Sequence, residues 1–224
     1  MCGRYTFLSE PAEIADLFEV EVPTALSRRY NVAPTQDVPA VRFDAAAAHR
    51  ELTLLRWGLV PFWAKDLGHG SRMINARAES VADKPSFRAA LAKQRCLILA
   101  TGFYEWKKTG ASKQPYYFRA ADGRPFAFAG LWDTWQPPGK PAVVSCTIIT
   151  TQANQTLAPV HDRMPVILSR QDYDTWLKPG VLAPEVLTRL LAPAPDTFLS
   201  ALAVDTWVNS PTHDDERCLI PAKV

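Results

Sequence analysis

Short apolar segments separated by turn-forming residues constrain the fold of this 224-residue chain more than any other feature of its sequence. Their β-branched and aromatic residues are typical of strands. Strands are predicted at residues 38–43, 51–57, 96–106, 116–119, 125–132, 142–151, 166–168 and 199–208. Because these strands outnumber the predicted helices and do not alternate with them, the sequence favours a mostly antiparallel α+β fold over a parallel doubly wound one.

Short helices and loops complete the predicted organisation. Helices are expected to begin near Ser9, Pro85, Ser169 and Pro184. Ser9 is expected to cap the first of them, and the second should expose Arg88. Residues 58–71 should form a surface loop of a length that usually carries function, and residues 107–114 a hairpin loop.

The composition is that of an ordinary globular protein, with 47% hydrophobic and 21% charged residues. We therefore expect a single domain over residues 1–224. No apolar run approaches the roughly 18 residues that a membrane helix needs, and the polar amino-terminal sequence lacks a secretory signal. The expected location is the cytoplasm.

Positive charge is concentrated in the middle of the chain. The net charge of the chain is +2, whereas residues 50–113 hold 12 Lys or Arg against 5 Asp or Glu, a net of +7. Trp57, Trp63, Tyr104 and Trp106 lie in the same stretch, and cations interleaved with aromatic rings are typical of a groove for single-stranded nucleic acid. On charge alone, an ordinary solvated face is the better explanation.

The four cysteines are widely spaced, without a CxxC pair or a nearby histidine pattern. Neither a disulfide scaffold nor a metal site is therefore predicted. Cys96, Cys146 and Cys218 lie in apolar runs and are expected to be buried as small hydrophobic residues. Cys2 is different, because the second residue becomes the amino terminus once the initiator methionine is removed.

An amino-terminal Cys2 would be a 1,2-aminothiol. Its α-amine would have a pKa near 8 and its thiol a pKa of about 8.5, so part of the amine is unprotonated at neutral pH. The amine can attack an aldehyde to form a Schiff base, and the thiol can then add to the imine and close a five-membered thiazolidine ring. The alternative is that Cys2 lies at the terminus by accident, and its position alone favours that alternative.

Several polar residues in apolar or proline-flanked segments are candidates for a reactive site. Glu105 should be half-buried, either as a general acid or base with a raised pKa or as the partner of an arginine. His161 is suited to proton transfer near neutral pH, and a core histidine bonded to backbone is equally compatible with its context. Asn75 and Arg77 would share one face of an extended segment, where they could hold an amine or sugar hydroxyl and a phosphate.

An ordered set of motifs along nearly the whole chain resembles the SOS response-associated peptidase (SRAP) family. The motifs are Met1–Tyr5, Tyr30–Pro34, Trp57–Pro61 with Trp63, Ile74–Glu79, Gly102–Lys107 and His161–Pro165. Each motif is weak alone, but the ordered set is improbable by chance. The resemblance implies the SRAP fold, with a barrel-like β core and short flanking helices. It also implies an abasic-site sensor, in which Cys2, freed of Met1, forms a thiazolidine crosslink with the ring-opened aldehyde of an abasic site in single-stranded DNA.

The resemblance assigns roles to individual residues. Glu105 would act in proton transfer, His161 would assist opening of the sugar ring, and Asn75 would position the Cys2 amine and the lesion; with Cys2 these are the implied catalytic residues. The implied DNA-binding residues are Arg4, Pro34, Trp63, Arg77, Trp106, Thr150 and Arg163. Trp63 would be a wedge where single strand meets duplex, and it is followed by Ala64, where some relatives have a second aromatic residue.

The same resemblance implies a monomer that uses no metal or other cofactor and associates with the nucleoid when bound to DNA. It implies removal of its own Met1 as a peptidase activity, together with an abasic-site lyase activity. Two other functions stay open. One is an amino-terminal-nucleophile amidohydrolase, which also begins Met-Cys-Gly, and the other is a non-catalytic single-strand binder in which Cys2 is incidental.

Overall fold

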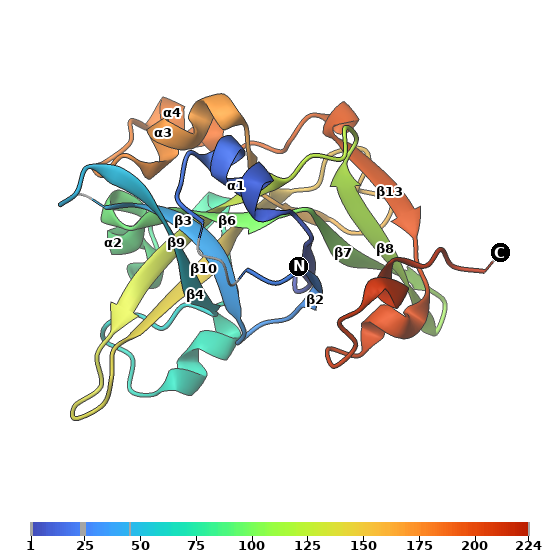
Figure 1. Cartoon of the computed structure of the whole chain (residues 1–224), viewed down its shortest axis with the longest axis horizontal. Helices are drawn as coiled ribbons and strands as arrows, with labels where there is room; N and C mark the ends of the chain where they lie inside the picture. The colour runs from blue at the N-terminus through green and yellow to red at the C-terminus, as the bar shows by residue number, and fades with distance from the viewer. Residues whose placement is uncertain (1, 23–25, 45, 224) are drawn as a thin grey trace.

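The strands of the computed structural model form two sheets, described for residues 2–22, 26–44 and 46–223 (Figure 1). In this part of the chain one sheet has five strands in the order β13-β8-β7-β1-β2, and the other has eight, in the order β11-β10-β4-β3-β6-β9-β12 with β5 beside β10. The strands of the first sheet are β1 Tyr5–Phe7, β2 Arg29–Val32, β7 Gly102–Thr109, β8 Ser112–Ala120 and β13 Leu199–Ala203. Those of the second are β3 Asp37–Asp44, β4 His49–Trp57, β5 Asn75–Arg77, β6 Arg95–Ala100, β9 Phe126–Trp135, β10 Val143–Gln152, β11 Arg163–Pro165 and β12 Ile167–Leu168.

The larger sheet closes on itself as a barrel. Strand β10 pairs with both β9 and β4, and β4, β3, β6 and β9 are joined in series. Strand β10 runs parallel to β4 and to β5, whereas the other paired strands of the described residues are antiparallel. The predicted α+β fold with a mostly antiparallel, barrel-like core is therefore confirmed.

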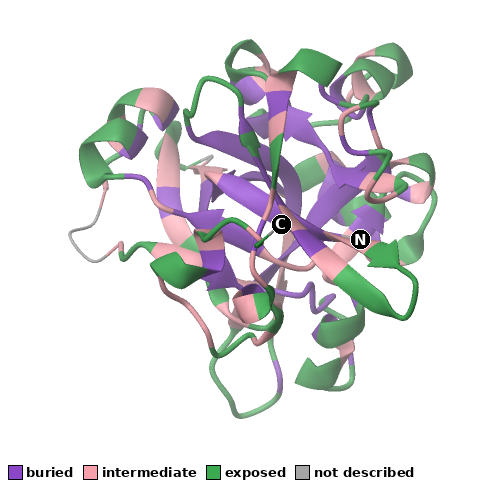
Figure 2. Cartoon of the chain, turned by 90° about the vertical axis from the view of Figure 1, so that its right-hand side faces the viewer, coloured by how far each residue is buried: buried purple, intermediate pink, exposed green. Residues whose placement is uncertain are grey.

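Strand β1 joins the five-stranded sheet to the interior of the barrel. The ring of Tyr5 is fully buried and meets Trp57 and Phe128 edge to face, with ring centroids 5.4 and 5.7 Å apart. Such contacts between large rings fill the space inside a small barrel. Figure 2 shows the buried residues along the strands and the exposed ones on the surrounding helices and loops. The amino-terminal segment is thus held where the two sheets meet.

The predicted single strand over residues 96–106 is wrong, because the chain passes from one sheet to the other at Thr101. The Thr101 hydroxyl lies 2.8 Å from that of Thr6 and accepts a hydrogen bond from the Leu8 amide at 3.2 Å. These contacts fix the crossover between β6 and β7. Gly102 begins β7, and a Cβ atom there would lie 2.3 Å from the hydroxyl of Tyr117, so a larger residue would force this ring to move.

The predicted hairpin loop over residues 107–114 is mostly strand. Thr109 already pairs with Ser112, so the turn between β7 and β8 consists of Gly110 and Ala111. Gly110 has a φ of +61°, which glycine adopts without the cost that a side chain would add. The hairpin therefore extends further from the barrel than the sequence indicated.

The predicted strand over residues 199–208 also ends early, at Ala203. Asp205 accepts a hydrogen bond from the backbone amide of Trp207 and so caps a short 3₁₀ helix, η5 (Thr206–Asn209). A side chain that satisfies helical amides favours the turn over continued strand pairing. The consequence is that the carboxy-terminal segment folds back over the β1–β7 region.

Short helices cover the barrel as predicted: α1 Pro11–Phe18, α2 Pro85–Lys93, α3 Tyr173–Leu177 and α4 Pro184–Leu190, with 3₁₀ helices η1 Leu67–Arg72, η2 Ala78–Ser80, η3 Arg170–Asp172, η4 Asp196–Phe198 and η6 Glu216–Leu219. Helices α1, α3 and α4 lie along the upper side of the molecule in the view of Figure 1. The predicted cap is wrong, since Glu10 and not Ser9 occupies the N-cap position of α1. Arg88 on α2 is exposed, as expected. Within the described ranges no helix has the length and hydropathy needed to cross a membrane.

The loop that follows β4 is a surface loop only in part. Leu59 and Val60 are fully buried, and the chain becomes exposed at Phe62. Gly58 has a φ of +122° and its backbone packs so closely on Gly70 that a Cβ atom would lie 2.7 Å from the Gly70 carbonyl oxygen. The buried start of the loop anchors the exposed part that carries Trp63.

Candidate active site

The segment before β1 brings Cys2 to three residues that lie far from it in the sequence. The backbone amide of Tyr104 donates a hydrogen bond to the Arg4 carbonyl at 3.0 Å, which places the start of the chain beside β7 and its Glu105. The Asn75 Nδ2 group, on β5, donates to the Cys2 carbonyl at 2.9 Å. His161 lies just before β11, with its Nε2 atom 3.9 Å from the Glu105 Oε2 atom. Cys2, Asn75, Glu105 and His161 thus converge where the barrel and the five-stranded sheet meet.

Glu105 is more deeply buried than the sequence indicated. Its exposed fraction is 2%, and the side chain 3.9 Å from its Oε2 atom is the ring of His161 rather than an arginine. Burial raises the pKa of Glu105 to about 7, and the negative charge of Asp162 acts in the same direction. Protonated and ionised forms are therefore both populated at neutral pH, which suits a group that gives and takes a proton.

His161 is held in one orientation by its own turn. The backbone amide of Arg163 donates to the Nδ1 atom of His161 at 2.9 Å. Asp162 Oδ1 lies 3.0 Å from the same nitrogen, but its side chain is 87% exposed and water screens it, so the amide decides the tautomer. Because Nδ1 accepts this bond, the neutral ring carries its proton on Nε2, the atom that faces Glu105. Burial lowers the pKa of His161 and keeps the neutral form dominant at neutral pH.

The thiol of Cys2 is fully buried, contrary to the expectation that the terminus presents it to solvent. Burial, and after it the negative charge of Glu105, raise the pKa of the thiol well above its ordinary value, whereas a hydrogen bond from the Arg4 backbone opposes this. The sulfur is therefore a neutral thiol in this structure. Cys96, Cys146 and Cys218 are buried, as predicted.

Arg4 is engaged by the carboxy-terminal segment. Its Nη1 group donates to Asn31 Oδ1 at 3.0 Å and to the Val208 carbonyl at 3.1 Å, and its Nη2 group donates to the Asn209 carbonyl at 3.3 Å. The ring of Trp106 lies 6.0 Å from the Arg4 guanidinium carbon and donates through Nε1 to Asn209 Oδ1 at 2.7 Å. Arg4 and Trp106 thus form one cluster beside the Cys2 segment, and the predicted contacts of both with DNA stay predictions.

Arg77, Thr150 and Arg163 lie on the His161 side of the site. Arg77 is exposed and lines a pocket of about 450 Å³ with Asp162 and Arg163. Thr150 is fully buried, and its carbonyl accepts a hydrogen bond from Arg163 Nη2 at 2.7 Å. The Thr150 side chain therefore reaches its protein neighbours and not the surface, so its predicted DNA contact has no exposed group to make it in this structure.

The predicted wedge is separate from the reactive cluster. Trp63 is 47% exposed, and its ring lies edge-on to His69 with the centroids 5.3 Å apart. Pro34 is half-exposed just after β2. The DNA contacts of Trp63 and Pro34 remain predictions.

Sequence reasoning missed Asn31 and Glu79. Asn31 is fully buried, and its Nδ2 group donates to the carbonyls of Val208, Ser210 and His213 at 2.7 to 3.1 Å. Glu79 receives both Nη groups of Arg163. Both residues lie inside motifs named above, so the signal was present, but polar residue type alone does not reveal such partners.

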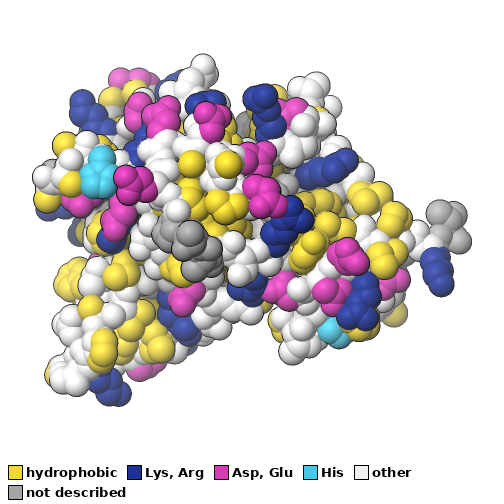
Figure 3. Space-filling model, viewed as in Figure 1, with side chains coloured by type: hydrophobic (Ala, Val, Ile, Leu, Met, Phe, Trp, Pro, Cys, Tyr) yellow, Lys and Arg dark blue, Asp and Glu magenta, His cyan; other side chains and the backbone are white. Residues whose placement is uncertain are grey.

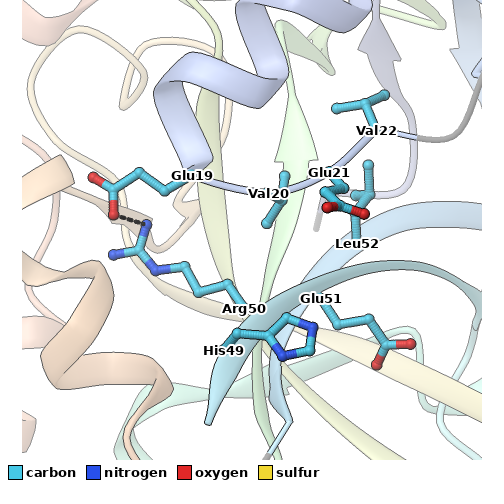
Figure 4. Close-up of a pocket in the computed structure, with 8 residues that line it drawn as sticks. All are labelled: Glu19, Val20, Glu21, Val22, His49, Arg50, Glu51 and Leu52. Carbon is cyan, nitrogen blue, oxygen red and sulfur yellow. Dashed lines mark ion pairs between the residues drawn. The ribbon is translucent and has the colours of Figure 1, made fainter. Parts of the chain in front are cut away.

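A pocket of about 760 Å³ is lined by none of the four residues Cys2, Asn75, Glu105 and His161 (Figure 4). It is lined by Glu19, Val20, Glu21, Val22, His49, Arg50, Glu51 and Leu52. Figure 3 shows further Asp and Glu side chains on the upper part of this face, where α1 and α3 lie. Because a surface rich in carboxylates repels phosphates, this pocket is a poor candidate for a polyanion. No cluster of three or more potential metal ligands occurs in the part of the chain that the structure describes.

The chain matches the family described as SOS response associated peptidase (SRAP) over residues 1–211. It is 41% identical to the abasic site processing protein YoqW of Bacillus subtilis over 223 residues, covering 98% of this chain and 99% of that protein. It is 32% identical to the abasic site processing protein HMCES of Gallus gallus over 225 residues, covering 87% of this chain and 66% of that protein. A crystal structure of a protein from Bacteroides thetaiotaomicron matches with a TM-score of 0.87 and 26% identity, covering 99% of this chain and 100% of that one. The resemblance drawn from the motifs is thereby confirmed, and the chain belongs to the SOS response-associated peptidase family.

Proposed function

We propose that this protein processes abasic sites by forming a covalent crosslink between Cys2 and single-stranded DNA. The observation that carries the proposal is the convergence of Cys2, Asn75, Glu105 and His161, with the pKa of Glu105 raised to about 7. The relatives named as abasic site processing proteins support the same substrate. Removal of Met1 is required, because the Cys2 nitrogen is otherwise part of a peptide bond.

The crosslink would form in two steps. The Cys2 amine adds to the C1′ aldehyde of the opened sugar, water leaves, and an imine results. The Cys2 sulfur then adds to the imine carbon while its proton passes to the ring nitrogen, which closes a thiazolidine. Glu105 is placed to protonate the departing hydroxyl and to accept the thiol proton, and the Nε2–H of His161 can donate to a sugar oxygen during ring opening.

The buried, neutral thiol sets the order of these steps. A thiol with a strongly raised pKa is a poor first nucleophile, so attack begins at the amine. The sulfur adds to the imine afterwards. This step is intramolecular, because the sulfur and the imine nitrogen belong to the same residue, and the effective concentration of the thiol is therefore high.

The remaining parts of the proposal concern DNA and the side reactions. Arg77 at the pocket beside His161 would hold a phosphate, and Trp106 would stack on a base. Trp63 would lie where single strand meets duplex. The protein would act as a cytoplasmic monomer at the nucleoid. A lyase reaction would compete with ring closure at the imine stage. In self-removal of Met1 the Cys2 thiol would give its proton to Glu105 and add to the Met1 carbonyl, the peptide bond would break as the acyl group moves from nitrogen to sulfur, and water would hydrolyse the resulting thioester.

The test combines intact mass with denaturing electrophoresis. Processed protein mixed with a single-stranded oligonucleotide that contains an abasic site should give an adduct with the mass of protein plus DNA minus water. Cys2→Ala and protein that retains Met1 should give no stable adduct, whereas Cys218→Ala, which alters a buried cysteine elsewhere, should react like the unchanged protein. An adduct of undiminished stability in Cys2→Ala would refute the thiazolidine.

A further inference from the structure

Glu79 is linked to His161 through a single residue, Arg163. The Arg163 Nη2 group donates to Glu79 Oε2 at 2.9 Å, and Nη1 donates to Glu79 Oε1. Nη2 also donates to the Thr150 carbonyl at 2.7 Å. A forked pair of this kind fixes a guanidinium in direction as well as in distance. Arg163 is thereby fastened to η2 and to β10 at once.

The backbone of the same arginine orients the histidine. Arg163 begins β11, and its amide donates to His161 Nδ1 at 2.9 Å. The side chain of Arg163 is only 12% exposed, and its bonds to Glu79 and Thr150 add to the β11–β10 pairing that holds this stretch of backbone. Glu79, Arg163 and His161 form a continuous series of hydrogen bonds that ends at the Nε2 atom facing Glu105.

We propose that Glu79 is a positioning residue that fixes the tautomer and the orientation of His161 through Arg163. The inference rests on the proposed function for its kinetic consequence, since His161 acts there as a proton donor. It gives a role to the last residue of the Ile74–Glu79 motif, for which the crosslinking chemistry has no direct use.

The effect of removing Glu79 distinguishes this role from phosphate binding by Arg163. Both Nη groups of Arg163 point to Glu79, and its Nε atom is buried without a hydrogen-bond partner. A phosphate would have to displace a carboxylate to be held by the same fork. Were Arg163 a phosphate ligand, loss of Glu79 would free it and remove a nearby negative charge, so DNA binding would strengthen and the reaction would not slow.

The experiment compares Glu79→Gln and Glu79→Ala with the unchanged protein and with Asp174→Asn. The control removes the same charge from an exposed ion pair elsewhere, in which Arg50 Nη2 lies 2.7 Å from Asp174 Oδ1. One readout is the pair of ¹⁵N chemical shifts of the His161 ring, measured without DNA. The others are the dissociation constant for an uncrosslinked oligonucleotide and the crosslinking rate at saturating abasic DNA.

In the unchanged protein and the control, the two ring nitrogens should give the well-separated signals of one tautomer. In Glu79→Ala the signals should move toward each other, and the saturating rate should fall about tenfold without weaker DNA binding. Glu79→Gln keeps one hydrogen-bond acceptor for Arg163, so its ¹⁵N shifts and its saturating rate should lie between those of the unchanged protein and those of Glu79→Ala. Unchanged ¹⁵N shifts in both variants, or a saturating rate equal to that of the control, would overturn the inference. If the unchanged protein forms no adduct, the proposed function fails, and the ¹⁵N shifts still decide the role of Glu79.

Discussion

Replacing Glu105 with glutamine should make the protein more stable at alkaline pH while slowing its reaction. Burial raises the pKa of this carboxyl from 4.5 to about 7. Each pKa unit corresponds to about 1.4 kcal/mol, so ionising Glu105 in the folded state costs about 3 kcal/mol more than ionising it in the unfolded chain. Glu105→Gln removes that cost and keeps the shape of the side chain.

The sign follows from proton binding. Between pH 4.5 and about 7 the folded state holds a proton on Glu105 that the unfolded state has lost, so stability falls as pH rises through this window. Above about pH 8 Glu105 is ionised in both states and the full ionisation cost lowers the stability of the unchanged protein. Below pH 4 Glu105 is protonated in both states and this cost is absent. The free energy of unfolding of Glu105→Gln, relative to the unchanged protein, should therefore rise by about 3 kcal/mol between pH 4 and pH 8.

Denaturant unfolding at pH 4, 6 and 8 measures this difference, with Glu185→Gln on the exposed start of α4 as the control. The crosslinking rate of Glu105→Gln should fall, because glutamine neither gives nor accepts a proton, while DNA binding stays nearly normal. A variant whose relative stability is the same at pH 4 and pH 8 would refute the argument that burial raises the pKa of this carboxyl.

Three further outcomes are expected. Asn31→Ala should lower the free energy of unfolding by about 3 kcal/mol, because it removes the buried amide that donates to three carbonyls of the carboxy-terminal segment and accepts a hydrogen bond from Arg4; a loss below about 0.5 kcal/mol in denaturant unfolding would contradict this. Gly102→Ala should destabilise the fold by about 1 to 3 kcal/mol, since the new Cβ meets the Tyr117 ring, and an unchanged unfolding midpoint would show that the ring yields freely. Arg77→Ala should weaken binding of single-stranded DNA evenly across sequences and reduce the salt slope by about 1, measured by titration at several salt concentrations; an unchanged slope would remove Arg77 from the phosphate path.

The long strands and the helices could be predicted from the sequence because each carries its own apolar pattern. Helix α2 buries Phe87, Ala90 and Leu91, the residues that its periodicity selects, and strand β3 buries the continuous apolar run of residues 38–41. The short strands β1, β2, β5 and β11 have too few residues for any period, and their extended state depends on neighbours supplied by distant segments. The break at Thr101 was missed for a related reason, since the apolar run continues through it and only the hydroxyl contacts mark the change of sheet.

The sequence predicted which residues form the site but not how deeply they are buried or which partners they have. The motifs named Cys2, Asn75, Glu105 and His161, and the structure brings them together. Burial depends on what packs above a residue, so the sequence indicated an accessible Cys2 where the structure shows a closed one. The partner of a charged residue has the same dependence, because the ion pair of Arg163 with Glu79 forms only where η2 lies beside β11.

The hydrogen bonds between Arg4 and the carboxy-terminal segment have a consequence for how the protein matures. Arg4 bonds to Val208 and Asn209, which lie 204 and 205 residues later in the chain. The segment that carries Cys2 therefore gains these contacts only after that carboxy-terminal segment has been synthesised. Until then Cys2 lacks neighbours that bury it in the folded protein, so its thiol is more accessible early in synthesis than after folding.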